Sequence, residues 1–191
     1  MSASRRAFDI AIVASLVTAV VVGGLGLVSG SLVVLAVAGD KLADAAMSAL
    51  NRWAHRAART GPDAEHPWGH GKIEAAMGLG QAALLTGIVV SVLVSAVNDL
   101  RDPGAPPDIA LAVVGLVLTG VVSIAISVVL ARAAHRDHAL TLEADAAHYR
   151  VDALHTTGAL VGIGLVGWTG QAWIDPLAAV VFAVFMGREA W

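Results

Sequence analysis

The chain has 191 residues, of which 57% are hydrophobic and only 14% are charged, and its mean hydropathy is +0.75. A soluble domain usually carries about 25% charged residues, so this sequence lacks the polar groups that would cover a surface in water. The net charge of -3 gives no basic footprint for nucleic acid, and the absence of cysteine excludes disulfides and thiolate metal ligands. We therefore expect an all-α protein that spans a lipid bilayer.

The hydrophobic segments, taken in chain order, predict six membrane-spanning helices, because a span needs about 20 mostly apolar residues. We expect no cleaved signal peptide at the N-terminus. Residues 10–39 carry no charge, which is longer than a signal h-region, and no clear cleavage site follows. The predicted spans form one domain, residues 1–191, and cover about 8–29, 31–57, 74–98, 109–131, 140–167 and 173–187.

The basic residues predict the orientation, because cytoplasmic loops of membrane proteins carry an excess of Lys and Arg. With the N-terminus in the cytoplasm, the opposite side of the membrane receives only Arg101. We therefore expect a multi-pass protein of the cell (inner) membrane with a cytoplasmic N-terminus. The cytoplasmic side then holds Arg5, Arg6, Arg52, Arg56, Arg59, Lys72, Arg132, Arg136 and Arg188.

Ionisable residues inside the second and fifth spans are the most informative feature of the sequence. Each costs about 2.5–3.5 kcal/mol at a helix centre, so such residues indicate a functional site by default. Asp40 and Asp44 lie four residues apart, as do His148 and Asp152, which places each pair on one helical face. Together the two pairs offer one imidazole and three carboxylates, enough for a tetrahedral site for a divalent metal ion.

The alternative is that these groups form buried structural salt bridges with Lys41 and Arg150. Lys41 directly follows Asp40, about 100° around the helix, so we expect its side chain to face elsewhere. Arg150 likewise lies off the stripe that contains the His–Asp pair. The spacing therefore favours the metal site.

Further polar residues extend both faces. Asp145 and His155 continue the stripe on the fifth span, and Ser48, Asn51 and His55 continue the aspartate face of the second span. They could line a hydrated access route. Alternatively, they could be helix ends that enter the membrane interface.

The loop between the second and third spans holds a second group of candidate metal ligands, Asp63, His66 and His70. Pro67 and Gly69 indicate a turn here rather than a helix. The loop therefore differs from the H-E-x-x-H arrangement of metalloproteases, which needs both histidines on one helical face. Without that motif, we expect no enzymatic activity such as intramembrane hydrolysis. The alternative to a metal site here is an ordinary polar loop whose histidines are solvated.

These motifs resemble those of the cation diffusion facilitators. The resemblance rests on Asp40-x3-Asp44, on the loop from Asp63 to Glu74, and on the segment from Ala144 to Asp152. The segment Trp173-Ile-Asp-Pro176 at the start of the last span is also similar. The resemblance extends over essentially the entire chain.

The resemblance implies a homodimer that exchanges divalent metal ions for protons by alternating access. Its transport site would be Asp40, Asp44, His148 and Asp152, a donor set typical of zinc, cadmium or iron exporters. The donors alone leave zinc (Zn2+), iron(II), manganese and cobalt plausible, with a preference for zinc or iron(II). The three loop residues Asp63, His66 and His70 match an accessory metal site of the family, and Asp175 matches a helix-start position without a ligand role.

Members of this family usually continue past the sixth span into a cytoplasmic ferredoxin-like domain. The sequence stops at Trp191, so we expect the transmembrane domain alone, either because the protein lacks the further domain or because the sequence is part of a longer chain. This departure keeps a second hypothesis open, namely a non-transporting metal-binding partner or sensor subunit in the membrane.

Overall fold

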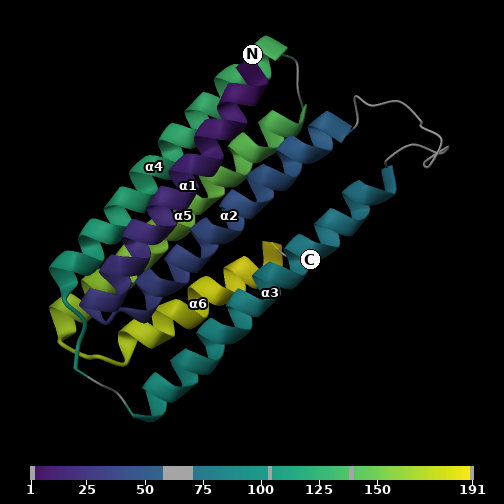
Figure 1. The fold of residues 1–191 in the computed structure, drawn as a ribbon. Helices are drawn as coiled ribbons and strands as arrows, with labels where there is room; N and C mark the ends of the chain where they lie inside the picture. The colour runs from purple at the N-terminus through teal and green to yellow at the C-terminus, as the bar shows by residue number, and fades with distance from the viewer. Residues whose placement is uncertain (1–2, 58–70, 103–104, 138–139, 190–191) are drawn as a thin grey trace.

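A computed structural model describes residues 3–57, 71–102, 105–137 and 140–189, and within them the protein is all helical, as the sequence predicts (Figure 1). Six helices follow one another along the chain and no strand occurs among the described residues. The helices are α1 (Ala3–Ser29), α2 (Leu32–Ala57), α3 (Gly71–Arg101), α4 (Ile109–Asp137), α5 (Leu140–Thr169) and α6 (Ile174–Glu189).

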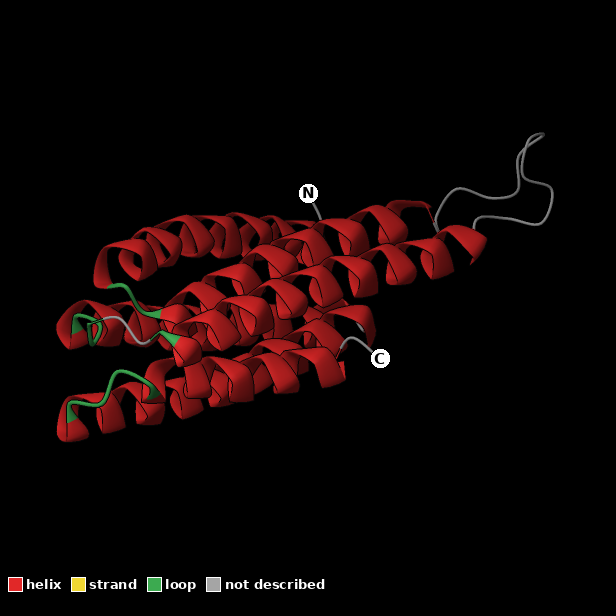
Figure 2. Ribbon diagram, turned by 90° about the horizontal axis from the view of Figure 1, so that it is seen from below, coloured by secondary structure: helices red, strands yellow, loops and turns green. Residues whose placement is uncertain are grey.

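Successive helices run in opposite directions along a common axis, so the bundle has two ends (Figures 1 and 2). The connections after α1, α3 and α5 lie at one end, and the start of α1 lies at the other. Helices α1, α2, α4 and α5 pack together, while α3 packs against α6 and α2. Gly30 and Gly170 end α1 and α5 with φ angles of 71° and 69°, a left-handed conformation that glycine adopts without steric cost.

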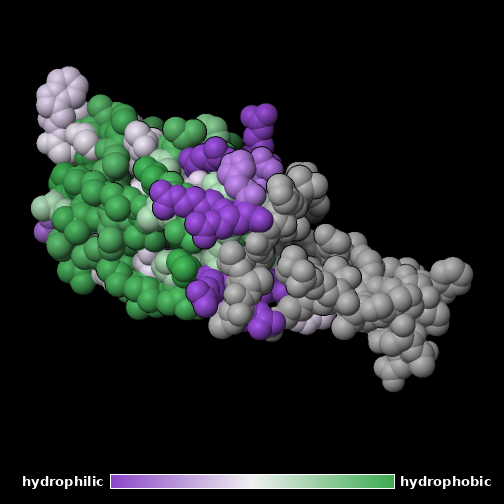
Figure 3. All heavy atoms as spheres, turned by 90° about the horizontal axis from the view of Figure 1, so that it is seen from above, coloured by the Kyte–Doolittle hydropathy of each residue, from purple (hydrophilic) through white to green (hydrophobic). Residues whose placement is uncertain are grey.

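The outer surface of the bundle is apolar enough for contact with lipid. Among the residues that the structure describes, three helical segments are long and apolar enough to cross a membrane, namely Arg5–Ser29, Ala82–Arg101 and Ile109–Arg136. The other three helices differ from these segments: α6 has only 16 residues, and α2 and α5 carry the ionisable residues of the predicted site. Figure 3 shows hydrophobic side chains over most of one face, with hydrophilic ones gathered towards one end.

The interior contains two apolar clusters with buried polar residues between them along the helices. One cluster centres on α2 and involves all six helices, and the other joins α1, α4 and α5. In α1, α4 and α5 most of the buried polar residues lie between the segments that enter the two clusters, so the helices share a polar layer inside the bundle. This layer includes Ser15, Thr18, Asp40, Lys41, Asp44, Thr119, Ser123, Asp152 and Thr156.

Candidate metal centre

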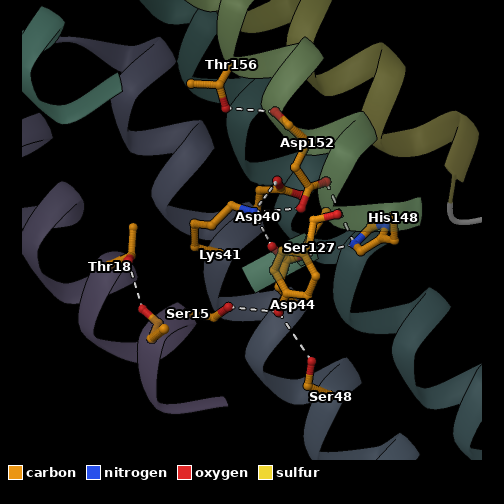
Figure 4. A network of polar contacts seen from close by, with 12 residues as sticks. Ser15, Thr18, Asp40, Lys41, Asp44, Ser48, Ser127, His148, Asp152 and Thr156 are labelled. Atoms are coloured by element: carbon orange, nitrogen blue, oxygen red, sulfur yellow. Dashed lines mark hydrogen bonds and ion pairs between the residues drawn. The ribbon is translucent and has the colours of Figure 1, made fainter. Parts of the chain in front are cut away.

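Helices α2 and α5 bring Asp44, His148 and Asp152 together inside the polar layer (Figure 4). One potential ligand atom from each of the three residues lies within 4.8 Å of the others. His148 Nε2 is 3.0 Å from Asp44 Oδ1 and 3.8 Å from Asp152 Oδ1. Both carboxylates are buried, and the imidazole is partly buried.

These separations suit a shared metal ion. With zinc–ligand bonds of about 2.0–2.2 Å and tetrahedral angles, two ligand atoms lie about 3.4 Å apart. The two imidazole–carboxylate distances, 3.0 and 3.8 Å, lie on either side of that value. Among the described residues, the buried Asp152 Oδ1 accepts no hydrogen bond. Because buried polar atoms are normally satisfied, this oxygen has the coordination capacity that a metal ion would use.

Asp40, the fourth residue of the predicted site, is buried on α2 but does not join this group of three. The Nζ of Lys41, on the same helix, lies 3.9 Å from Asp40 Oδ2. The structure therefore brings three of the four predicted residues within reach of one ion. The role of all four as metal ligands stays a prediction.

The prediction that Lys41 faces away from the site is wrong. Its Nζ donates hydrogen bonds to Asp44 Oδ2 and to Asp152 Oδ2, the second at 2.7 Å. The ammonium also lies 5.2 Å from the centre of the Tyr149 ring. The alternative interpretation, in which these carboxylates form buried salt bridges, is therefore correct for Lys41.

The helical spacing of Lys41 misleads because its side chain is long. A difference of 100° separates Cβ directions, but four methylene groups let the ammonium turn back towards its partners. The signal in the sequence was the lysine itself, because an ammonium inside a span needs a nearby anion. Arg150 follows the prediction: it is exposed, and its Nε donates to the Ala146 carbonyl oxygen within α5.

Tyr149 connects the site to α1 and to the second half of α2. Its hydroxyl lies 2.8 Å from Ser15 Oγ on α1 and 3.2 Å from Ser48 Oγ on α2. One turn after Asp152, Thr156 donates to the Asp152 carbonyl oxygen within α5. The two contacts of the Tyr149 hydroxyl thus link α5 to α1 and α2 beside the three candidate ligands.

The remaining predicted residues have other positions or lie outside the description. Asp145 is buried on α5, and His155 stacks on Phe185 of α6 with ring centres 5.3 Å apart. The structure does not describe the side chains of Asn51 and His55. The loop ligands Asp63, His66 and His70 also lie outside the described residues, so the accessory site stays a prediction.

Asp175 links two helices rather than binding at the centre. From the first turn of α6, its Oδ1 accepts a hydrogen bond from Ser31 Oγ, and its Oδ2 accepts one from the Leu32 backbone N–H, both at 2.6 Å. A carboxylate at a helix N-terminus satisfies free backbone donors and favours the helix dipole. Asp175 therefore caps α2 and ties it to α6, a role that the sequence did not reveal.

Comparison with known proteins gives a family for this arrangement. The chain matches the family described as the cation efflux transmembrane domain over residues 10–191. It is 32% identical over 165 residues to the cation-efflux pump FieF of Shewanella oneidensis, covering 86% of this chain and 55% of that protein.

Two further relatives show the same extent of similarity. An uncharacterized transporter of Synechocystis is 32% identical over 158 residues, which cover 80% of this chain and 49% of the relative. The cation-efflux pump FieF of Yersinia pestis is 29% identical over 170 residues, which cover 85% of this chain and 56% of the relative. The chain thus spans about half the length of the curated relatives it matches.

Proposed function

This chain belongs to the cation efflux family, the cation diffusion facilitators, and on that premise we propose that it exports a divalent metal ion from the cytoplasm in exchange for protons. The observation that carries the proposal is the convergence of Asp44, His148 and Asp152 within the polar layer of the bundle. Intramembrane ionisable groups are costly, and they mark ion pathways in transporters.

Proton exchange follows from the chemistry of the donors. A metal ion needs ionised carboxylates and a neutral imidazole, so its binding expels any protons those groups hold. Protons arriving from the other side compete for the same lone pairs and release the ion. The site therefore holds either the metal or protons, which is the requirement for exchange.

Zinc and iron(II) are the ions we favour. One imidazole with carboxylates is a donor set that these ions accept, whereas magnesium prefers oxygen ligands and water. Manganese, cadmium and cobalt remain candidate substrates for the same donors. The two relatives named FieF are both cation-efflux pumps, which supports export of a cation as the activity.

Alternating access would come from relative movement of helix groups around the fixed site, as in other transporters with a central binding site. The antiparallel order of the helices supports a cytoplasmic N-terminus in the inner membrane. In this order, one end of the bundle holds Arg5, Arg52 and Arg136, and the other end holds Arg101. By family resemblance, we also propose a homodimer and an accessory metal site in the loop.

Flux measurements in proteoliposomes test the proposal. We expect zinc or iron(II) movement driven by an imposed pH gradient, and loss of that flux in Asp152→Asn. The matched control is Asp108→Asn, which also removes one carboxylate. Asp108 is exposed, and it caps α4 by accepting from the Leu111 backbone N–H, a role that Asn fills equally well.

Two results would contradict export by this site. One is a metal flux through the Asp152→Asn variant that equals the flux through the wild-type protein. The other is metal binding without flux in the wild-type protein. The second result would instead support a metal-binding partner or sensor.

A further inference from the structure

Lys41 lies where three aspartates meet, and the proposed transport chemistry does not use it. Its side chain is 1% exposed. Its Nζ binds one oxygen of Asp44 and one of Asp152, lies 3.9 Å from Asp40, and lies beside the Tyr149 ring. Figure 4 shows the side chain reaching from α2 into the carboxylates.

The carboxylates of Asp44 and Asp152 are each shared between two neighbours. Their Oδ2 atoms face the ammonium of Lys41, and their Oδ1 atoms face His148 Nε2. An ion bound beside His148 would therefore lie on the opposite edge of the same two carboxylates. There it would be repelled by the ammonium charge, which is buried and therefore screened less than a charge in bulk water.

The position of the ammonium also explains why Asp40 does not join the other three candidate ligands. An ion that touched all three carboxylates would need the space among their oxygens, and Nζ occupies that space. Asp40 can reach such an ion only if Lys41 withdraws. The Lys41 ammonium and a metal ion bound by all four predicted residues therefore cannot occupy the centre at the same time.

We propose that Lys41 is a specificity-determining residue, a tethered cation that competes with the metal ion for Asp44 and Asp152 and thereby weakens metal binding. The proposal rests on the proposed function, because it concerns the same site. It explains how a site with three carboxylates can release a divalent ion: the ammonium returns to the carboxylates as the ion leaves. Any ion that binds here must also displace the tethered ammonium of Lys41. A divalent ion can do so, whereas a weakly bound monovalent ion cannot, so the ammonium selects against monovalent ions.

Zinc binding to the purified full chain in detergent, followed by calorimetry, tests the proposal. We expect Lys41→Met to bind zinc at least about tenfold more tightly than wild type, because removal of a nearby like charge favours the ion. Lys41→Arg keeps the charge and should stay close to the wild-type affinity. A residue with a merely structural role would change the thermal stability of the metal-free protein without tightening zinc binding.

The outcomes separate the two proposals. If wild type binds zinc and the folded Lys41→Met variant binds it with equal or lower affinity, the role of Lys41 is refuted while the site survives. If neither wild type nor the Lys41 variants bind zinc, iron(II) or cadmium, the proposed function fails as well.

A second measurement needs no change to Lys41, should its variants fail to fold. The sequence contains two lysines, Lys41 and Lys72, so protein labelled with nitrogen-15 at lysine Nζ gives two side-chain signals, assigned with Lys72→Arg. We expect added zinc to shift the Lys41 signal in the wild-type protein and not in Asp44→Asn. An unchanged Lys41 signal at saturating zinc would refute the proposal.

Discussion

In Asp44 and in Asp152, one carboxylate oxygen faces the His148 imidazole and the other binds the Lys41 ammonium. Two buried carboxylates without such partners would be strongly unfavourable, so Lys41 stabilises the metal-free bundle. The same contacts keep both carboxylates oriented towards His148. At the residue scale, the stability of the bundle and the proposed metal binding therefore depend on the same atoms.

His148 supplies the nitrogen donor among the three converging residues, so its replacement should change metal preference. We expect His148→Gln to weaken zinc binding at least about tenfold, a loss of roughly 1.4 kcal/mol. Manganese binding should fall less, because manganese accepts oxygen ligands readily. Calorimetric titration of each metal into the purified variant measures both effects.

His155→Gln is the matched control for that substitution. His155 lies two turns further along α5 and stacks on Phe185, outside the group of three converging residues. Its replacement should leave zinc affinity unchanged. Equal losses of zinc affinity in the two variants would show that His148→Gln does not act by removing a metal ligand.

The sequence predicted much of the site at this scale, and the reason is periodicity. Residues four apart share a helical face, so the pairs Asp40/Asp44 and His148/Asp152 could be recognised before the fold was known. The position of Lys41 could not be, because a flexible side chain reaches well beyond the face that its Cβ defines. As a result, the ammonium of Lys41 lies at the centre of the cluster, and the carboxylate of Asp40 does not.

At the scale of helices, α5 packs closely on α6 at Gly162, beyond the His–Asp pair on the same helix. Gly162 on α5 allows this approach, since a Cβ at this position would lie only 2.7 Å from Ala178 Cβ on α6. Neither atom belongs to a flexible chain end, so relief requires the helices to separate. Small residues at such contacts are usual where membrane helices pack closely.

Gly162→Ala should therefore destabilise the bundle, by about 1–3 kcal/mol if it behaves like other overpacked sites. Thermal unfolding in detergent measures the change. Gly164→Ala is the matched control on the same helix, because a Cβ there meets nothing within 4 Å. If the two alanine variants unfold at the same temperature, the contact between α5 and α6 is looser than the structure indicates.

The six helices could be predicted from the lengths of the apolar segments alone. Which helices pack against each other could not be predicted. In a chain that is apolar nearly throughout, an apolar face does not identify its partner helix. The link from Asp175 to the start of α2 shows the difficulty, since it joins residues 143 or 144 positions apart. Family resemblance gave Asp175 only a helix-start position.

At the scale of the whole molecule, charge asymmetry between the two ends of the bundle should fix its orientation in the membrane. The absence of cysteine from the chain makes a direct test possible. Asp102 follows α3 at one end, Arg136 lies in the last turn of α4 at the other, and both are exposed. Single cysteines at these positions can be labelled on intact cells with a maleimide that does not cross membranes.

We expect Asp102→Cys to react on intact cells and Arg136→Cys to react only after the cells are permeabilised. The reverse pattern would place the N-terminus outside and would make the proposed transport direction untenable. Labelling of both positions in permeabilised cells serves as the control for accessibility.

The most direct test of a shared metal site is a zinc-soaked crystal of this chain, measured by anomalous diffraction at the zinc edge. The account predicts a peak about 2.0–2.2 Å from Asp44, His148 and Asp152, with the Lys41 ammonium moved away from their oxygens. Zinc bound elsewhere, with the three side chains still joined by Lys41, would contradict it.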